Sequence, residues 1–376
     1  MIRNILKRPR SLSLCLLMPC MVIAFSSRIV YASTPNVNEL QAKAQKGFVN
    51  QEIELAQAYF MGDGVAHDQR LAAFWYQKAA EGGDPEAQNL VGYFYEMGFG
   101  VPADAARAFH WYQLSAASGL SDATLNLGVL YVSGVGVKKD VAAAAHYFEE
   151  AARKGNGTGA TYLGTLYYVG AGVKQDKVAA EHWYAIGEKM HDPISAYDLG
   201  TLYSTVPDHP HDFSKAARFL RQSTEARYLP AIHSLALLLI HHPELAKSQH
   251  EALDLLETAA NAGYWKSSIL LGIVARDGIG VSVDNKAAYY HFRVAILQGG
   301  AAAQALVTGD TFKISTLLGP EQAQALDSEA NLWFQQHPPT PAFVRVKGNR
   351  KFFSEPAHTG SADILNASLP QTDPLS

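Results

Sequence analysis

Cysteine is almost absent from this chain. Its 376 residues include two cysteines, Cys15 and Cys20, and both lie close to the amino terminus. Once the segment that holds them is removed, no cysteine is left. This excludes structural disulfide bonds and catalysis by a cysteine nucleophile in the rest of the chain.

The sequence also lacks the common motifs of catalysis and nucleotide binding. It contains no Ser-x-x-Lys, no His-Glu-x-x-His and no Gly-Lys-Ser/Thr phosphate loop. Its Gly-x-Gly pairs have no predicted strand before them and no third glycine after them, which argues against a dinucleotide site. We therefore expect no enzyme activity, no catalytic residue, no cofactor and no metal.

Positive charge is not in excess. The chain has 31 basic and 35 acidic residues, a net charge of −4. Without residues 1–32, which hold five basic residues and no acid, 26 basic residues face 35 acidic ones, a net charge of −9. An acidic protein does not favour nucleic acid, which needs a concentrated positive face. Beyond this leading segment, no stretch is apolar enough to span a membrane.

What the chain does contain is a repeat of 36 residues. The glycine pair Gly62 and Gly64 recurs in the same register, and units five and six keep the register although they lose the glycines. The later pairs are Gly98 and Gly100, Gly134 and Gly136, Gly170 and Gly172, and Gly278 and Gly280. Such a period indicates seven copies of one structural unit.

Each unit is predicted to form two helices joined by a glycine turn. In the second unit, Val91, Gly92 and Tyr95 share one face of helix A, and Asp104 is placed to cap helix B. Alanine follows four residues after the cap, where a small side chain lets the helices approach closely. The cap positions are Asp68, Asp104, Asp140, Asp176, Asp212, Ser248 and Asp284, and the alanines are Ala72, Ala108, Ala144, Ala180, Ala216, Ala252 and Ala288.

The pattern LGxxYxxGxGVxxDxxxAxxWYxxAAxxG resembles that of the Sel-one-like repeat (SLR) family, relatives of the tetratricopeptide repeats, over roughly residues 36–337. The resemblance implies an all-α fold, a right-handed superhelical α-solenoid of about seven helix-turn-helix repeats with half-repeat caps. It also implies a protein-binding adaptor, in bacteria often exported. The expected repeats are 52–87, 88–123, 124–159, 160–195, 196–231, 232–267 and 268–303.

The two ends of the repeat array differ from its interior. Within the predicted solenoid, residues 33–337, we expect half a unit at the start and a cap helix over residues 320–337 at the end. After His337 the composition changes to Pro-Pro-Thr-Pro and then to a polar, proline-containing stretch. We expect residues 338–376 to be a disordered tail.

The amino terminus has the pattern of a signal peptide. Basic residues precede an apolar stretch from Leu12 to Phe25, and Val30 and Ala32 supply the small side chains that signal peptidase reads. We expect cleavage of residues 1–32 after Ala32 and a secreted or periplasmic protein with no membrane span. The alternatives are an uncleaved anchor and, through Cys20, a lipid anchor.

A groove on the concave side is the expected binding site, if helix A lines it as in tetratricopeptide repeats. Its uncharged lining suits an extended peptide or a partner helix. The residues are Leu125, Val129, Val132, Thr161, Thr165, Tyr168, Ile194, Tyr197 and Thr201. The more polar flanks, Asn89, Glu96, Lys266, Arg276 and Asp277, are placed to orient the ends of a ligand. The alternative is that tighter curvature buries the nine side chains against one another.

Histidines form two further groups. His110, His146 and His182 stand at one position of consecutive units, which indicates either a packing position or a pH-sensitive stripe. The second group lies where units five and six lose the glycine turn: Asp208, His209, His211, Asp212, His241, His242, Glu244 and His250. These residue types suit zinc, but their spacing is irregular, so we expect two solvent-exposed loops.

Together these observations predict an exported scaffold or adaptor that binds a protein or peptide and performs no chemistry. The alternative is a cell-envelope hydrolase or a protein that binds glycan or peptidoglycan. A hydrolase needs a nucleophile or an acid–base pair that converges in one pocket, whereas an adaptor needs only a continuous surface.

Overall fold

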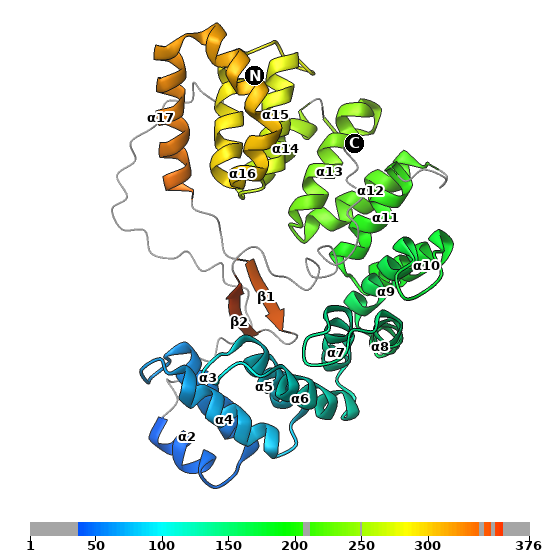
Figure 1. Ribbon diagram of the computed structural model, residues 1–376, viewed down its shortest axis with the longest axis vertical. Helices are drawn as coiled ribbons and strands as arrows, with labels where there is room; N and C mark the ends of the chain where they lie inside the picture. Colours follow the sequence, from blue (N-terminus) through cyan, green and yellow to red (C-terminus); the bar gives the residue numbers. More distant parts are fainter. Residues whose placement is uncertain (1–36, 206–210, 249, 338–341, 347–349, 356–376) are drawn as a thin grey trace, which may run out of the picture. The chain divides into compact units, whose positions relative to one another are not determined.

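The computed structural model describes residues 37–205, 211–248, 250–337, 342–346 and 350–355. Helices account for most of them (Figure 1). The helices are α2 (Val37–Ala44), α3 (Val49–Met61), α4 (Gln69–Glu81), α5 (Pro85–Met97), α6 (Ala105–Ala117), α7 (Ser121–Ser133), α8 (Val141–Arg153), α9 (Gly157–Val169), α10 (Lys177–Lys189), α11 (Pro193–Thr205), α12 (Phe213–Glu225), α13 (Leu229–His241), the 3₁₀ helix η1 (Pro243–Leu245), α14 (Glu251–Asn261), α15 (Trp265–Asp277), α16 (Asn285–Leu318) and α17 (Pro320–Gln336). Within these described residues no helix has the length and apolar character needed to cross a membrane.

Each repeat folds as the predicted pair of helices. The odd-numbered helices from α3 to α15 are the A helices, and the even-numbered helix that follows each is its B helix. Within each unit, the two helices of a repeat pack together, for example α3 with α4 and α5 with α6, and a B helix packs on the next A helix, as α4 does on α5. The predicted all-α solenoid of seven helix pairs, preceded by the half-repeat α2, is confirmed.

Aspartate caps explain where the B helices begin. In the second repeat, the Asp104 carboxylate accepts hydrogen bonds from the backbone N–H groups of Ala106 and Arg107, at 3.1 and 3.0 Å. Such a cap stabilises a helix by about 1 kcal/mol. The same arrangement holds at Asp68, Asp140, Asp176, Asp212 and Asp284.

Ser248 is the exception, and the prediction that it caps a helix is wrong. Helix α14 begins at Glu251, and its N-terminal flanking residue, His250, makes no capping hydrogen bond with its side chain. The glycine turn is missing in this repeat, and η1 takes its place. The chain therefore enters α14 by a different path, on which the backbone carbonyl of Ser248, rather than its hydroxyl, accepts the N–H of Glu251 at 3.2 Å.

Close packing of helix A on helix B depends on a glycine and an alanine. A Cβ added at Gly92 would lie 2.7 Å from the Tyr112 ring, and one at Gly128 would lie 2.4 Å from Phe148. The alanine of helix B, such as Ala108, is fully buried. The predicted small positions thus allow two helices to approach closely around a large aromatic side chain.

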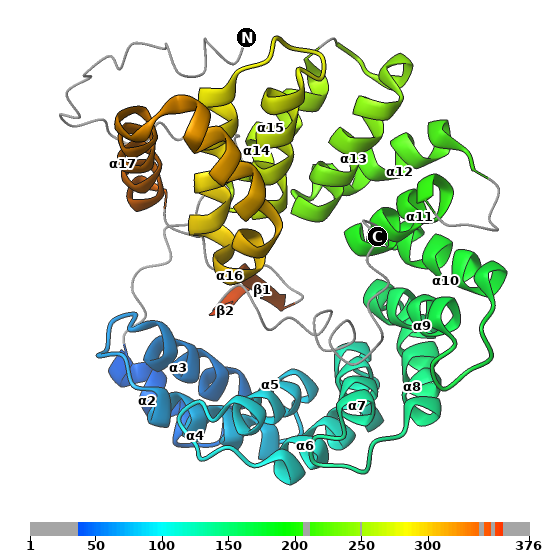
Figure 2. The same cartoon turned by 45° about the horizontal axis from the view of Figure 1, so that its top comes forward.

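The structure divides into two compact units. The N-terminal unit comprises residues 37–162 and 171–174, and the C-terminal unit comprises residues 163–170 and the described chain from residue 175 onward. In the N-terminal unit, α2 to α8 follow one another in sequence (Figure 1). In the C-terminal unit, Figure 2 shows α15, α16 and α17 side by side, and α16 packs against both of the others.

The end of the solenoid is longer than predicted. Helix α16 continues as far as Leu318, with a break at Gly300, where φ is 57° and ψ is −136°. Its second part and α17 form the cap, whereas the sequence indicated only the helix over residues 320–337. Ala303, Val307 and Ile314 are buried on this added segment, so its apolar face closes the core of the last repeat.

A hairpin lies within the segment that was predicted to be disordered. β1 (Ala342–Val346) and β2 (Arg350–Glu355) pair antiparallel, with Phe343 opposite Ser354. These eleven residues lie within residues 338–376, for which the sequence predicted a disordered tail. Aromatic and β-branched residues are frequent in both strands, and such residues favour extended pairing even in a polar stretch. The other residues beyond His337 lie outside the described part of the chain, as do residues 1–36 with the predicted signal peptide.

Candidate binding site

The nine residues of the predicted groove are distributed over both units. Four belong to the N-terminal unit: Leu125, Val129 and Val132 on α7 and Thr161 on α9. Five belong to the C-terminal unit: Thr165 and Tyr168 on α9 and Ile194, Tyr197 and Thr201 on α11. The two sets differ in how much of each side chain is exposed.

Three of the four residues in the N-terminal unit are buried. The exposed fractions are 7% for Val129, 1% for Val132 and 1% for Thr161, and only Leu125 is partly exposed. Val129, Val132 and Thr161 therefore do not line an accessible groove, which corrects the prediction. Helix α7 is apolar almost all round, and such a helix packs into a core on most of its surface.

The five residues in the C-terminal unit are all partly exposed. The Tyr184 hydroxyl donates a hydrogen bond to the Thr165 hydroxyl at 3.3 Å, which links α10 to α9. The Tyr197 ring meets the Tyr228 ring edge to face at 5.4 Å, and its hydroxyl bonds with Ser234 and Thr201. This part of the prediction is therefore a surface on α9 and α11 made of aromatic and hydroxyl groups.

Asp198, which the sequence analysis did not include, follows Tyr197 on α11. It is partly buried on α11 and raises the pKa of Tyr168, Tyr184 and Tyr197, in each case after the larger effect of burial. Burial, and next the charge of Asp192, raise the pKa of Asp198 well above its usual value. We refer to Tyr168, Tyr184, Tyr197 and Asp198 as the Asp198 patch.

One signal in the sequence could have identified Asp198. It stands between Tyr197 and Leu199 in the middle of a predicted A helix, where aspartate is an unfavourable residue. Asn126 and Ser234 occupy the same register in other repeats, so the position accepts polar groups without charge. Glu54 has a carboxylate at this register in the first repeat, but its side chain is exposed, whereas that of Asp198 is partly buried.

A second polar cluster adjoins the patch on α13 and α15. His233 stands one repeat after Tyr197, and its Nδ1 atom lies 3.1 Å from the Ser267 hydroxyl. Its ring contacts Tyr264 at 5.5 Å, and burial, with a smaller effect of Lys266, lowers the pKa of His233 to about 4. Burial and Tyr197 raise the pKa of Tyr264, so the cluster lies within electrostatic reach of the patch.

In the N-terminal unit the corresponding polar groups bind one another. Asn126 donates a hydrogen bond from Nδ2 to Oδ1 of Asn89 at 2.9 Å, across adjacent A helices. Asn156 in the same way donates to Asp122 at 2.7 Å. These two hydrogen bonds stabilise contacts between neighbouring repeats.

Most of the flanking polar residues are also engaged. Glu96 accepts a hydrogen bond from the Tyr112 hydroxyl at 2.7 Å, and Arg276 binds Asp277 and Asp310 at 2.6–2.8 Å. Lys266 instead lies over the Trp265 ring, at 5.8 Å from its centroid.

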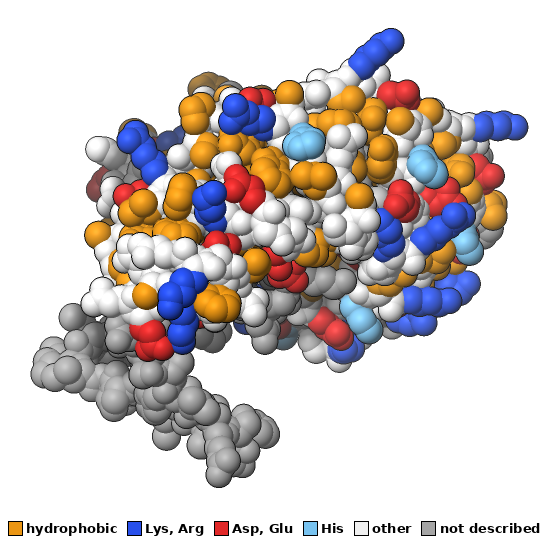
Figure 3. All heavy atoms as spheres, turned by 90° about the horizontal axis from the view of Figure 1, so that it is seen from below, with side chains coloured by type: hydrophobic (Ala, Val, Ile, Leu, Met, Phe, Trp, Pro, Cys, Tyr) orange, Lys and Arg blue, Asp and Glu red, His pale blue; other side chains and the backbone are white. Residues whose placement is uncertain are grey.

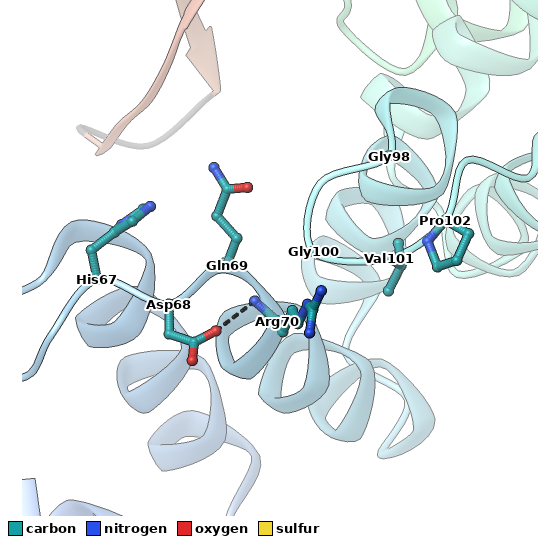
Figure 4. Close-up of a pocket in the computed structure, with 8 residues that line it drawn as sticks. All are labelled: His67, Asp68, Gln69, Arg70, Gly98, Gly100, Val101 and Pro102. Atoms are coloured by element: carbon teal, nitrogen blue, oxygen red, sulfur yellow. Dashed lines mark hydrogen bonds between the residues drawn. The ribbon is translucent and has the colours of Figure 1, made fainter.

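A cavity lies elsewhere, in the turns of the first two repeats (Figure 4). It has a volume of about 840 Å³ and is lined by His67, Asp68, Gln69, Arg70, Gly98, Gly100, Val101 and Pro102. The polar groups are mostly bound to the backbone: Asp68 caps α4, and Nδ1 of His67 lies 2.7 Å from the Phe60 carbonyl. This arrangement holds a turn in place and does not resemble a catalytic pair.

The histidine groups have local roles. His110, His146 and His182 are exposed, and each lies beside the aromatic residue that follows it. In the turn region of repeats five and six, His242 stacks on Phe213 at 3.8 Å and contacts Glu244 at 3.2 Å. Asp208 and His209 lie outside the described residues. Within the described ones, no three potential ligands lie close enough to hold a metal ion.

Surface charge is mixed where it can be followed. On the face shown in Figure 3, acidic and basic side chains are interspersed among hydrophobic ones. A surface of this kind does not favour the phosphate backbone of a nucleic acid, whose binding depends on a concentrated positive face. Contacts with a protein require no such face.

Comparison with known protein families shows to which of them this chain belongs. The Sel1 repeat model matches seven consecutive segments, which coincide with the seven helix pairs: 52–84, 85–120, 121–156, 158–188, 193–228, 230–264 and 266–300. This chain belongs to the Sel1 repeat family. Sel1 repeats commonly serve as scaffolds for interactions between proteins.

A solved structure agrees with the Sel1 repeat fold, and a second one is similar in sequence. A Sel1 repeat protein from Oxalobacter formigenes is 25% identical, covers 69% of this chain and 98% of its own, and superposes with a TM-score of 0.55. A protective antigen of uropathogenic Escherichia coli strains, which displays an SLR fold, is 24% identical over 84% of this chain and 76% of its own, with a TM-score of 0.49. No curated protein matches the sequence.

Proposed function

We propose that this Sel1 repeat protein is an exported scaffold that binds an extended segment of a partner protein on the A helices of its C-terminal unit. The observation that supports this is the contrast in exposure along the predicted groove. Thr165, Tyr168, Ile194, Tyr197 and Thr201 are all partly exposed, whereas three of the four groove residues on the N-terminal unit are buried.

The chemistry of this surface suits a peptide. Tyrosine rings supply large, rigid contact area, and threonine hydroxyls can pair with the backbone of an extended segment. Aromatic residues are also the side chains that most often dominate the free energy of binding at protein interfaces. We propose binding without catalysis, because the carboxylate that lines the cavity of Figure 4, Asp68, and the aspartates at the starts of the other B helices serve as helix caps.

Binding is tested by a paired substitution. Tyr168→Ala together with Tyr197→Ala should weaken partner capture by about 1–4 kcal/mol, an order of magnitude or more. The matched control is Lys138→Ala with Lys139→Ala, two exposed residues in the turn of the third repeat. Capture is measured by crosslinking and quantitative mass spectrometry in extracts of the native host. Circular dichroism must show the same helical content for both variants.

Two results would contradict the binding proposal. Equal capture by the tyrosine variant and the native protein would show that the surface is only structural. Loss of capture in the lysine variant alone would move the binding site to the turns.

Export rests on the amino-terminal sequence alone. The supporting observation is the basic start, the apolar stretch and the Val-Tyr-Ala sequence that ends at Ala32. The amino terminus of protein isolated from the native host should be Ser33, as read by mass spectrometry. A cytoplasmic protein that retains Met1 would contradict export without affecting the binding proposal.

A further inference from the structure

We propose that the second part of α16, residues 301–318, binds the same segment of a second copy of this chain. In the resulting dimer the two helices lie antiparallel, with Gly309 of each copy on the two-fold axis. This inference does not depend on the proposed function. The dimer carries two copies of any binding surface, which strengthens the binding of a partner that has repeated segments.

The first argument is that this segment has two apolar faces, of which the described residues cover one. The covered face closes the core of the last repeat. The other face consists of Gly309 and the positions three, four, seven and eight residues to either side of it, and we refer to it as the Gly309 face. All of its positions are exposed, and its large apolar side chains are exposed by 64% at Leu306, 72% at Phe312 and 73% at Leu317.

The second argument is that the other terminal helices have polar outer surfaces. The ends of a solenoid need such surfaces, because no further repeat covers them. On α2, Glu39 and Lys43 are exposed and form an ion pair at 2.8 Å. The exposed side chains of α17 are mostly polar as well: Glu321, Gln322, Gln324, Ser328, Glu329 and Asn331. The Gly309 face, whose one charged residue is Lys313, is the exception, and an exposed apolar surface of this kind is typical of a protein interface.

The third argument is the glycine at the centre of the face. Gly309 lies in the interior of a helix, where glycine is less favourable than alanine. A Cβ added to Gly309 would meet no atom within 4 Å among the described residues. The packing of these residues therefore gives no reason for glycine at this position. A second helix supplies one, since glycine at a crossing point lets two backbones approach closely.

The fourth argument is that the Gly309 face fits a copy of itself. In an antiparallel pair centred on Gly309, each residue before Gly309 lies opposite the residue that follows Gly309 by the same number of positions. Leu306 thus lies opposite Phe312 of the other copy, and two large apolar side chains meet. The remaining longer side chains each lie opposite an alanine: Lys313 opposite Ala305, Thr316 opposite Ala302, and Leu317 opposite Ala301. Long side chains opposite short ones let two helices pack closely.

The two polar side chains of the face do not oppose burial. The Thr316 hydroxyl donates a hydrogen bond to the Phe312 carbonyl of its own helix at 2.9 Å, so it needs no other partner. Lys313 can extend its ammonium group past Ala305 of the other copy into water, because its methylene stem is long and alanine is short. A second copy of the chain therefore leaves neither group unsatisfied.

A paired substitution tests the surface. Leu306→Glu together with Phe312→Glu places charges in the interface, where their burial is unfavourable. The matched control is Val178→Glu together with Val283→Glu, at two apolar side chains that are 75% and 61% exposed and lie outside the face. Sedimentation velocity at about 1–100 μM protein should show a dimer that increases with concentration in the native protein and in the control. The Kd of the dimer should be at least about tenfold weaker in the Leu306 and Phe312 variant.

A pair of cysteines tests the antiparallel register. In a chain with Cys15 and Cys20 replaced by serine, Ala302→Cys together with Thr316→Cys should form disulfide-linked dimers under mild oxidation, because positions 302 and 316 of the two copies lie opposite each other. Each substitution alone should form none, since the two copies of either position lie about 21 Å apart along the helices. Electrophoresis without reducing agent measures the linked fraction.

Several results would overturn the proposal. A native protein that stays monomeric at these concentrations would do so. In that case, a lower melting temperature of the Leu306 and Phe312 variant would show that another part of the chain covers the face, and an unchanged one would leave the face to a different protein. A dimer that persists in this variant, or that is lost equally in the control, would place the interface elsewhere. Linked dimers from either cysteine alone, or none from the pair, would reject the antiparallel arrangement.

Discussion

The second to fourth repeats, which have the glycine turn, and the sixth repeat, which lacks it, are joined to their neighbours by different chemistry. In the second, third and fourth repeats, the second glycine of the turn lies directly on the backbone at the start of the preceding B helix. A Cβ added at Gly100 would lie 2.0 Å from the Gln69 carbonyl oxygen, and one at Gly136 would lie 2.2 Å from that of Ala105. Only a residue without a side chain fits there.

The sixth repeat replaces this backbone contact with charged side chains. Glu244 stands in the register of that glycine, within η1. The guanidinium of Arg221, on the preceding B helix, pairs with Glu251 and donates to the Leu245 carbonyl at 2.9 Å. Glu251 also accepts the backbone N–H of Lys247 at 2.5 Å.

The difference shows that the register between repeats can be held in two ways. A backbone contact depends on shape and tolerates no added atom, but it does not respond to pH. An ion pair tolerates changes in the turn itself, but it weakens with acid and, where exposed, with salt. The loss of glycine in the sixth repeat is therefore a change of chemistry within one fold.

The largest expected effect comes from adding a methyl group to the glycine turn. Gly136→Ala should lower the free energy of unfolding by about 2–5 kcal/mol. Alanine is strained at the positive φ of this position, and its Cβ would clash with the backbone of Ala105. Glu244→Ala, at the same register of the sixth repeat, should change it by less than about 0.5 kcal/mol. Chemical denaturation measures both, and equal effects would contradict the comparison.

A third variant separates the two causes in Gly136→Ala. Gly119 also has a positive φ, 93°, but an added Cβ there meets no atom within 4 Å among the described residues. Gly119→Ala should therefore lower the free energy of unfolding only by the backbone strain of alanine at a positive φ, about 1–2 kcal/mol.

Acid is expected to weaken the last repeats through buried histidine. Burial lowers the pKa of His291 to about 4, against an unfolded value of 6.5, so the unfolded state binds the proton more readily. Neutral His291 therefore contributes to the free energy of unfolding above pH 6.5. This contribution, up to about 3 kcal/mol, is lost as the pH falls from about 6.5 to about 4. His291→Phe places at this position an aromatic residue that does not titrate, as in other repeats. Urea unfolding at pH 7 and pH 4 measures the stability lost on acidification, and this loss should be smaller in the variant than in the native protein. The same loss in the variant would disprove the assignment.

Breaking the ion pair of the sixth repeat should have an intermediate effect. Glu251→Gln should lower stability by about 1–3 kcal/mol, since Arg221 keeps a mostly buried charge. Burial raises the pKa of Glu251, but the hydrogen bonds from Arg221 and Lys247 outweigh this and lower it. The ionised Glu251 carboxylate therefore stabilises the fold above its unfolded pKa of 4.5. This stabilisation is lost as the pH falls through the lower pKa that Glu251 has in the folded protein. Melting curves between pH 7 and pH 3 should converge with those of the variant, and parallel curves would contradict this.

The smallest expected effect is a gain in stability. Arg227 ends the B helix of the fifth repeat with a φ of 58°, where other repeats have glycine, such as Gly119 and Gly155. Arg227→Gly should raise the free energy of unfolding by about 1 kcal/mol, because glycine adopts this conformation without strain. Gly155→Arg should lower stability by a similar amount in the same assay. If neither substitution has an effect, the strain at Arg227 is relieved by other means.

Much of the fold could be predicted from the sequence because the same pattern of helix, turn and cap residues recurs in each repeat. Six of the seven predicted caps form, since an aspartate before a B helix acts locally and in the same way in each unit. The exception at Ser248 and the added part of α16 both occur where the period fails. The hairpin was missed because composition was given more weight than the short alternation in its strands.

The candidate site could be predicted only in part. Helix periodicity placed Val129 and Tyr168 on the same side of their helices, and it could not show that the first is 7% exposed while the second remains partly exposed. Asp198 was missed because the prediction selected the uncharged residues of a surface.

The sequence by itself determined the repeat length, the helix pairs, the caps and the glycine turns, because these depend on contacts between residues close in the chain. The tertiary structure alone decided which side chains of the A helices stay accessible and which polar groups find partners in the next repeat. Burial and hydrogen-bond satisfaction depend on how closely adjacent repeats approach. That distance is set jointly by side chains 30 or more residues apart, as the bond from Asn126 to Asn89 shows.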